Sequence, residues 1–352
     1  MVLSKKDHLV GLDIGSSSIK VAELQISRNK KILKKFGMEP LIPGAIVEGR
    51  IMDMEAVAKT IRSLFRSQKI RKKDVAISTG GHSVVIKTIN TVKMPEKDLQ
   101  ESIVAEAEQY IPYDIEDVNI DYQILGESQF SPDQMNVLLV AVKKDLVAEY
   151  MDLTTNAGLN AKIIDVDTFA LQNIYETVPG QNPDDITLLL DVGASKTSLN
   201  ILKESTSMMM RDNDSGTHQI VEQICSRFET DVQAAEKILQ NPEENAPDPE
   251  VVALILDDVA NIWCSEICEV VNTFQSNTND TRVTKVVLSG GGSYIPGFAD
   301  KLTSELSAKV VTISPFAGLH LNEKKFSAAF TSRVGPRAPI ALGLALRRVD
   351  DK

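Results

Sequence analysis

The chain has 352 residues and a net charge of −11 at pH 7, with 43% hydrophobic and 25% charged residues. This length allows two or more domains with sizeable cores, and the acidic balance argues against nucleic acid or an anionic membrane surface as the main partner. Its three cysteines form no disulfide framework, and no run of about 18 apolar residues could span a membrane. These features predict a cytosolic protein without direct membrane insertion.

Two strands around a Gly-Ser-Ser-Ser turn are predicted for residues 9–26. The first strand is an apolar run, and the second has apolar residues close to alternate positions. Gly15 lets the backbone approach a ligand closely. The N–H groups and hydroxyls of Ser16, Ser17 and Ser18 are typical of an anion-binding turn, so this turn is a candidate phosphate site.

Asp13 is the last charged residue before this turn. A carboxylate beside bound phosphate would repel it unless a cation lay between them, so the pattern predicts Mg²⁺, held mostly through waters. Lys20 can reach the same turn and contact terminal phosphates as a point charge. An ordinary Gly-Ser hairpin turn explains these residues about equally well, because Asp-x-Gly is common in turns.

A second copy of the pattern lies at residues 188–202 and aligns Asp191 with Asp13 and Gly193 with Gly15. Its other candidate phosphate contacts are Ala194, Ser195 and Thr197. An internal repeat at this separation indicates a duplicated fold rather than a simple turn. Two such turns facing each other would clamp a polyphosphate, with both carboxylates on one metal ion.

A buried strand that runs into three glycines and then a helix is predicted for residues 283–298. Together with the two turns, it resembles the actin-like ATPase superfamily, in which such a glycine run contacts adenosine. The resemblance implies an α/β, duplicated ribonuclease H-like fold of two domains with ATP or ADP and Mg²⁺ between them. The implied adenosine contacts are Gly290, Gly291, Gly292 and the acid of an Ala-Glu pair, Glu236.

The remaining elements up to residue 160 predict a compact insertion in the first domain. They are a helix after Asp53, a hairpin at 75–93, a helix opening at Pro95, strands at 118–125 and 136–142, and a helix from about 145 to 156. The predicted parts are a first domain at 1–84 and 161–185, an inserted subdomain at 85–160, and a second domain at 186–352 with a helical part at about 217–280.

The bacterial cell-division protein FtsA and the PilM family of type IV pilus assembly proteins carry an inserted subdomain at this place. The chain resembles the PilM family through almost its whole length, with matching segments at 11–20, 106–113, 121–123, 157–159, 288–292 and 343–347. FtsA continues into a linker and a membrane-targeting helix, whereas this chain stops soon after Arg348.

The PilM resemblance implies a cytoplasmic scaffold that is peripheral to the inner membrane through protein partners. Its implied partner is the cytoplasmic N-terminal tail of PilN, bound as an extended peptide between the inserted subdomain and the first domain. Indirect links to PilO, PilP and the pilus motor ATPases are also implied.

Asp167 lies at the start of a predicted helix, after a strand at 163–167. In the actin-like superfamily an acid or amide at this first crossover between domains positions the attacking water, and the resemblance gives that role to Asp167. Asp is shorter than the usual Glu or Gln, and Asp167 could instead cap the helix before Thr168. A second crossover helix is expected at 339–347, where Gly343 would allow close packing between domains.

Enzymatic alternatives to a scaffold stay open, with at most slow ATP hydrolysis expected. A sugar-kinase-like phosphotransferase would need a base beside an acceptor pocket, and the sequence shows no acid in such a context. An FtsA-like filament, and hence a homo-oligomer, is neither supported nor excluded, because polymerisation surfaces leave no short motif.

Overall fold

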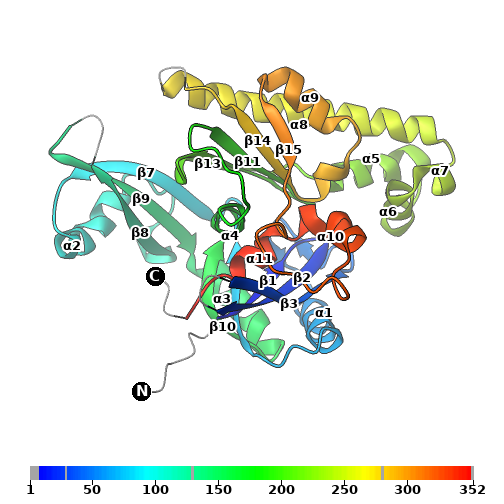
Figure 1. Ribbon diagram of the computed structural model, residues 1–352, viewed down its shortest axis with the longest axis horizontal. Helices are drawn as coiled ribbons and strands as arrows, with labels where there is room; N and C mark the ends of the chain where they lie inside the picture. The colour runs from blue at the N-terminus through cyan, green and yellow to red at the C-terminus, as the bar shows by residue number, and fades with distance from the viewer. Residues whose placement is uncertain (1–7, 28–29, 128–130, 279–280, 350–352) are drawn as a thin grey trace.

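Two five-stranded sheets form the two halves of the molecule (Figure 1), a computed structural model that describes residues 8–27, 30–127, 131–278 and 281–349. In spatial order, the first sheet contains β3 (Lys30–Pro40), β2 (Ser18–Ser27), β1 (Val10–Ile14), β6 (Asp74–Thr79) and β10 (Asn160–Val166). The second contains β13 (Thr206–Asn213), β12 (Thr197–Lys203), β11 (Ile186–Val192), β14 (Lys285–Ser289) and β15 (Lys309–Thr312).

The two sheets repeat one topology. In each, three antiparallel strands are followed by two strands that run parallel to the central one. Asp13 pairs with Lys20 across the first hairpin, and Asp191 pairs with Ser198 across the second. The duplication predicted from the two sequence copies is therefore confirmed. Both carboxylates lie near the carboxyl ends of central strands, where open α/β sheets bind ligands.

A separate three-stranded sheet makes up most of the insertion. Its strands, in spatial order, are β7 (Val84–Val92), β9 (Gln134–Lys143) and β8 (Val118–Glu127), and helix α2 (Glu96–Ala107) packs on it. The hairpin predicted for 75–93 is wrong, because β6 pairs with β1 and β10 whereas β7 pairs with β9. The chain changes sheets at Gly80 and Gly81, where Gly81 has a φ of +80°. Alternating apolar residues indicate strands but do not identify their partners.

Helix α3 (Lys144–Asn156) follows the insertion but packs under the first sheet. Its buried Leu146 and Leu153 share a core with Ile61 of helix α1 (Met54–Ser67). Because α3 packs in the core of the first domain, the part of the chain that packs as the insertion ends near residue 143, whereas the predicted subdomain extends to 160.

A group of helices between residues 218 and 306 accompanies the second sheet, with α8 and α9 lying along it in Figure 1. They are α5 (His218–Phe228), α6 (Val232–Gln240), α7 (Pro242–Asn245), α8 (Pro249–Asn277) and α9 (Phe298–Leu306). Trp263 of α8 and Phe298 of α9 meet edge to face, with 5.5 Å between ring centroids, inside the largest apolar core. In the described part of the chain, we find no helix whose length and apolar character would let it cross a bilayer.

Helices α4 (Asp167–Tyr175) and α11 (Pro339–Leu344) cross between the two halves. A Cβ atom on Gly343 would lie 1.7 Å from the carbonyl oxygen of Ala170, so this approach requires glycine. The close packing predicted at Gly343 is confirmed. The short helix α10 (Ala328–Val334) and the 3₁₀ turn η3 (Gly335–Arg337) precede α11, and this segment covers apolar side chains of β2 and β3.

Candidate functional site

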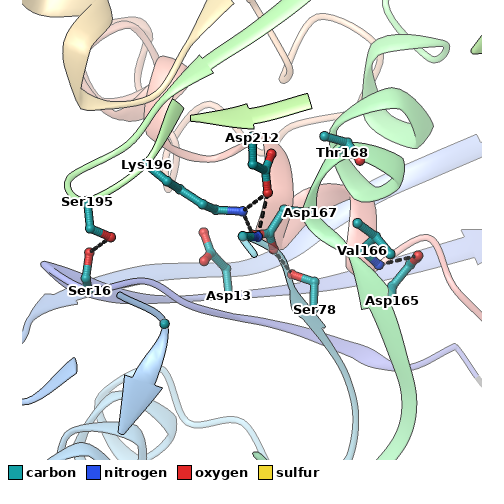
Figure 2. A network of polar contacts seen from close by, with 12 residues as sticks. Asp13, Ser16, Ser78, Asp165, Val166, Asp167, Thr168, Ser195, Lys196 and Asp212 are labelled. Atoms are coloured by element: carbon teal, nitrogen blue, oxygen red, sulfur yellow. Dashed lines mark hydrogen bonds and ion pairs between the residues drawn. The ribbon is translucent and has the colours of Figure 1, made fainter. Parts of the chain in front are cut away.

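The tips of the two hairpins meet between the halves of the molecule. The N–H of Gly15 donates to the Ser18 carbonyl at 3.2 Å, and the N–H of Gly193 donates to the Lys196 carbonyl at 2.9 Å, so the two turns close in the same way. The hydroxyl oxygens of Ser16 and Ser195 share a hydrogen bond of 2.9 Å across the gap, as Figure 2 shows. The two candidate phosphate turns therefore face each other.

Both predicted metal ligands are withdrawn from bulk water. Asp13 is 6% exposed and pairs with the Lys20 ammonium at 3.0 Å; burial raises the pKa of this carboxyl, and Lys20 acts in the opposite direction. Asp191 accepts a hydrogen bond from Ser289 Oγ at 2.6 Å. Burial raises the pKa of Asp191 to about 6, although the Ser289 hydrogen bond opposes this rise. Two carboxylates in such surroundings favour a nearby cation.

The carboxylates of Asp13 and Asp191 fit Mg²⁺ bound partly through water and ligand oxygens better than they fit a metal surrounded by protein groups alone. Mg²⁺ prefers oxygen ligands and keeps several waters, so one or two carboxylates plus phosphate oxygens suffice. No group of three or more His, Cys, Asp or Glu side chains surrounds a common point within the residues described. Asp13 and Asp191 would hold the ion together with ligand oxygens and water, as the sequence predicts.

Asp167 does not cap α4. The N-cap is Val166, and the Asp167 side chain makes no capping hydrogen bond, so the capping interpretation is wrong. Its carboxylate instead accepts a hydrogen bond of 2.5 Å from Ser78 Oγ and pairs with the Lys196 ammonium at 2.7 Å (Figure 2). The carboxylate is therefore aimed at the gap between the domains, where a water-positioning acid would have to lie.

Lys196 also pairs with Asp212 of β13, at 3.2 Å. Asp212 accepts a further hydrogen bond of 2.5 Å from the N–H of Gly81, where the insertion begins. Burial disfavours the charged form of Lys196, but Asp167 and Asp212 outweigh it and raise the pKa of the ammonium. Burial likewise disfavours the Asp212 carboxylate, and Lys196 nevertheless lowers its pKa.

The glycine run predicted to contact adenosine follows β14. Gly290 has a φ of +82°, and a Cβ atom there would lie 2.2 Å from the carbonyl oxygen of Val192. A Cβ on Gly292 would lie 2.3 Å from a methyl group of Val192, so both glycines are needed for packing against β11. Gly291, in the 3₁₀ turn η2 (Gly291–Tyr294), would meet nothing closer than Thr217, at 3.7 Å.

The start of α5 joins the second hairpin to this glycine run. The N–H of His218 donates to the Ala194 carbonyl at 2.8 Å. Burial lowers the pKa of His218, and the charges of Glu222 and Glu236 oppose this shift, which places Glu236 within electrostatic reach of the α5 start. Thr197 is buried and donates its hydroxyl to the Ser215 carbonyl at 2.7 Å, so this side chain serves the hairpin itself.

The family model described as "Type IV pilus assembly protein PilM" matches residues 11–349. The chain belongs to the PilM family. A solved structure described as the "PilM-PilN type IV pilus biogenesis complex" is 28% identical over 98% of this chain and 100% of that one, with a TM-score of 0.87. The predicted PilM family and the actin-like two-domain fold are thereby confirmed. This PilM-family chain is thus a type IV pilus assembly protein with an actin-like fold.

A more distant match shares the fold alone. The ethanolamine utilization protein EutJ from Carboxydothermus hydrogenoformans is 14% identical, with coverage of 97% of this chain and 89% of that one and a TM-score of 0.56.

The sequence of this PilM-family protein did not predict that the site contains the side chains of Ser78, Lys196, Asp212 and Arg337. Lys196 takes the place of Ser18 in the second copy, so a position-by-position comparison of the copies would have revealed it. Arg337 donates to Ser18 Oγ at 3.3 Å from the far end of the chain. Neither Ser78 nor Asp212 stands in a recognisable motif, and only the fold brings them to Asp167 and Lys196.

Proposed function

We propose that this PilM-family protein binds ATP or ADP with Mg²⁺ between its two domains and acts as a cytoplasmic scaffold of type IV pilus assembly. The contact between Ser16 and Ser195 carries this proposal, because it brings the two candidate phosphate turns together at one point. Asp13 and Asp191 supply the carboxylates for Mg²⁺, Lys20 supplies a charge for terminal phosphates, and Gly291 lies open toward adenosine. Asp167 would position water in any hydrolysis.

The cytoplasmic tail of PilN is the partner that we propose for the insertion. A small groove of about 50 Å³ lies where β7 meets β10 and β13. Its apolar lining is Val84, Ile86, Val166 and Met210, and its polar lining is Thr168, Arg211 and Asp212. β7 is an edge strand of its sheet, so its outer backbone groups can pair with an added strand. An extended peptide could thus bind between the insertion and the first domain. Through it, the scaffold would lie at the inner membrane and connect to PilO, PilP and the motor ATPases.

Nucleotide loading tests the first part of the proposal. The purified protein is incubated with Mg-ATP for several hours, and retained nucleotide and released phosphate are both quantified. We expect retained ATP with little phosphate, and loss of retention in Asp13→Ala but not in Asp184→Ala, which removes an exposed carboxyl. Equal retention in Asp13→Ala would exclude the two-hairpin clamp. Sustained phosphate release that is lost in Asp13→Ala would favour a cycling ATPase instead.

Peptide titration tests the second part. A fluorescent peptide with the sequence of the PilN N-terminal tail is titrated with wild-type protein and with Ile86→Asp, which puts a charge into the groove. Asn90→Asp is the matched control, because it adds the same charge at an exposed position farther along β7. We expect at least about tenfold weaker binding for Ile86→Asp alone, with nucleotide retention unchanged. Equal peptide affinity for the two variants would exclude this groove.

A further inference from the structure

Lys196 is a charged residue of the site to which the proposed function gives no role. Its ammonium lies 2.7 Å from Asp167 and 3.2 Å from Asp212. Asp167 begins the crossover helix α4 after the first sheet, whereas Lys196 lies in the turn before β12 and Asp212 lies in β13, both in the second half of the molecule. One ammonium therefore joins carboxylates from the two halves of the molecule. We call these two contacts the Lys196 clasp.

The surroundings of the clasp are shaped to hold it. The Ser78 hydroxyl donates to the other oxygen of Asp167, at 2.5 Å, and the Gly81 N–H donates to Asp212 at 2.5 Å. A Cβ atom on Gly80 would lie 2.0 Å from the Lys196 ammonium nitrogen, so the absence of a side chain there makes room for the cation. The Lys196 side chain is only 25% exposed, which limits screening of these charges by solvent.

We propose that Lys196 is a built-in cation that holds the two domains together and keeps Asp167 from contacting water. As a result, bound ATP is retained rather than hydrolysed. This inference rests on the proposed function. In hydrolysis, a water oxygen forms a bond to the γ-phosphorus, and the bond to the β–γ bridging oxygen breaks with its electron pair leaving on ADP. The proton of that water leaves with the phosphate product, and a side chain that orients the water needs a free oxygen facing it. One oxygen of Asp167 already accepts from the Ser78 hydroxyl and the other faces the Lys196 ammonium, so neither is free to orient a water.

The clasp also gives the domains a closed arrangement that does not depend on a ligand. Without the ammonium, the carboxylates of Asp167 and Asp212 would face each other at close range and repel. The Gly81 N–H, which is held by Asp212 next to the insertion, would then lose protection. Removal of Lys196 should therefore loosen the start of β7 as well as free Asp167.

Hydrogen–deuterium exchange of the nucleotide-free protein tests the clasp without reference to activity. Lys196→Ala is compared with wild type and with Lys203→Ala, which removes an exposed lysine from the far end of β12, the strand that follows Lys196. We expect exchange in peptides covering residues 79–83 to become at least about tenfold faster in Lys196→Ala only. Unchanged exchange in Lys196→Ala overturns the proposal.

Retention and phosphate release with Mg-ATP are measured on the same proteins and on Gly80→Ala. Its added methyl would lie 2.0 Å from the Lys196 ammonium nitrogen and 2.9 Å from Asp167 Oδ2, so it separates these two groups while keeping every charge. We expect Lys196→Ala and Gly80→Ala to retain ATP at first and to release phosphate about tenfold faster than wild type, a small part of what orientation of a reacting group can contribute. Retained ATP with unchanged release in both variants overturns the clasp but leaves nucleotide binding intact. Failure of the wild type to retain any nucleotide overturns the proposed function, and this inference with it.

Discussion

The hydroxyl oxygens of Ser16 and Ser195 lie 2.9 Å apart, although 179 positions separate these residues in the chain. Each hydroxyl belongs to the turn of a hairpin whose first strand has a buried or half-buried aspartate as its second-last residue. A polyphosphate bound between the domains would replace this mutual hydrogen bond with bonds from both turns to its own oxygens. Such bonds, made to a charged acceptor, are stronger than the one they replace.

Removal of either hydroxyl should weaken nucleotide binding. Ser16→Ala and Ser195→Ala each delete one donor to a charged group, which is worth about 1.5–3 kcal/mol. We expect the Kd for Mg-ADP to rise about tenfold or more in each variant, measured by calorimetry. Ser276→Ala, at an exposed position on α8, is the control and should bind like wild type. If the two turn variants bind Mg-ADP as well as this control does, the turns do not hold phosphate.

Asp191 should make the stability of the nucleotide-free protein fall with rising pH. Burial raises its pKa from the ordinary 3.8 to about 6, so between about pH 4 and pH 6 the folded state keeps a proton that the unfolded state releases. The free energy of unfolding therefore decreases as pH rises through this window and levels off above it. Ser289 and Lys20 limit the rise, while Asp13 and Asp167 add to it.

The neutral variant Asp191→Asn isolates this effect. Chemical unfolding is followed at several pH values, and the stability of Asp191→Asn minus that of wild type is plotted against pH. We expect this difference to grow by up to about 3 kcal/mol between pH 4 and pH 6 and then to stay constant. A difference that is independent of pH would mean that Asp191 titrates normally.

Gly343→Ala should destabilise the fold. The added methyl would meet the Ala170 carbonyl of α4, and backbone atoms of two packed helices cannot move apart cheaply. We expect a loss of about 1–3 kcal/mol in the free energy of unfolding. Ser304→Ala, at an exposed position of α9, is the control and should change the free energy of unfolding by no more than about 0.5 kcal/mol. Equal stability of the two variants would show that α4 and α11 can separate freely.

The part of the site that repeats in the sequence could be predicted from it. The positions of Asp13 and Asp191 could be predicted because the same short pattern appears twice, and this pattern predicts a strand, a carboxylate and a turn together. The three glycines after β14 could also be recognised in the sequence as a run. In the structure, two of them are required because a side chain there would collide with Val192.

The rest of the site depends on contacts between residues far apart in the chain. Asp167 has the sequence of a helix cap, but Ser78 and Lys196 provide stronger partners than the backbone of its own helix. Strand periodicity likewise could not show that the chain changes sheets after β6, because alternation is the same in either sheet. Both failures come from tertiary contacts that override local preference.

The return of the C-terminal segment to the first sheet has a consequence for biosynthesis. Side chains of β2 and β3, among them Leu24 and Phe36, are covered by Phe316, Phe326 and Leu342. The sheet that is synthesised first therefore cannot bury this face until residues 316–342 have also been synthesised. The second sheet, whose strands lie between residues 186 and 312, can close earlier. Although domains commonly fold in the order in which they emerge, here the second half can complete its core before the first.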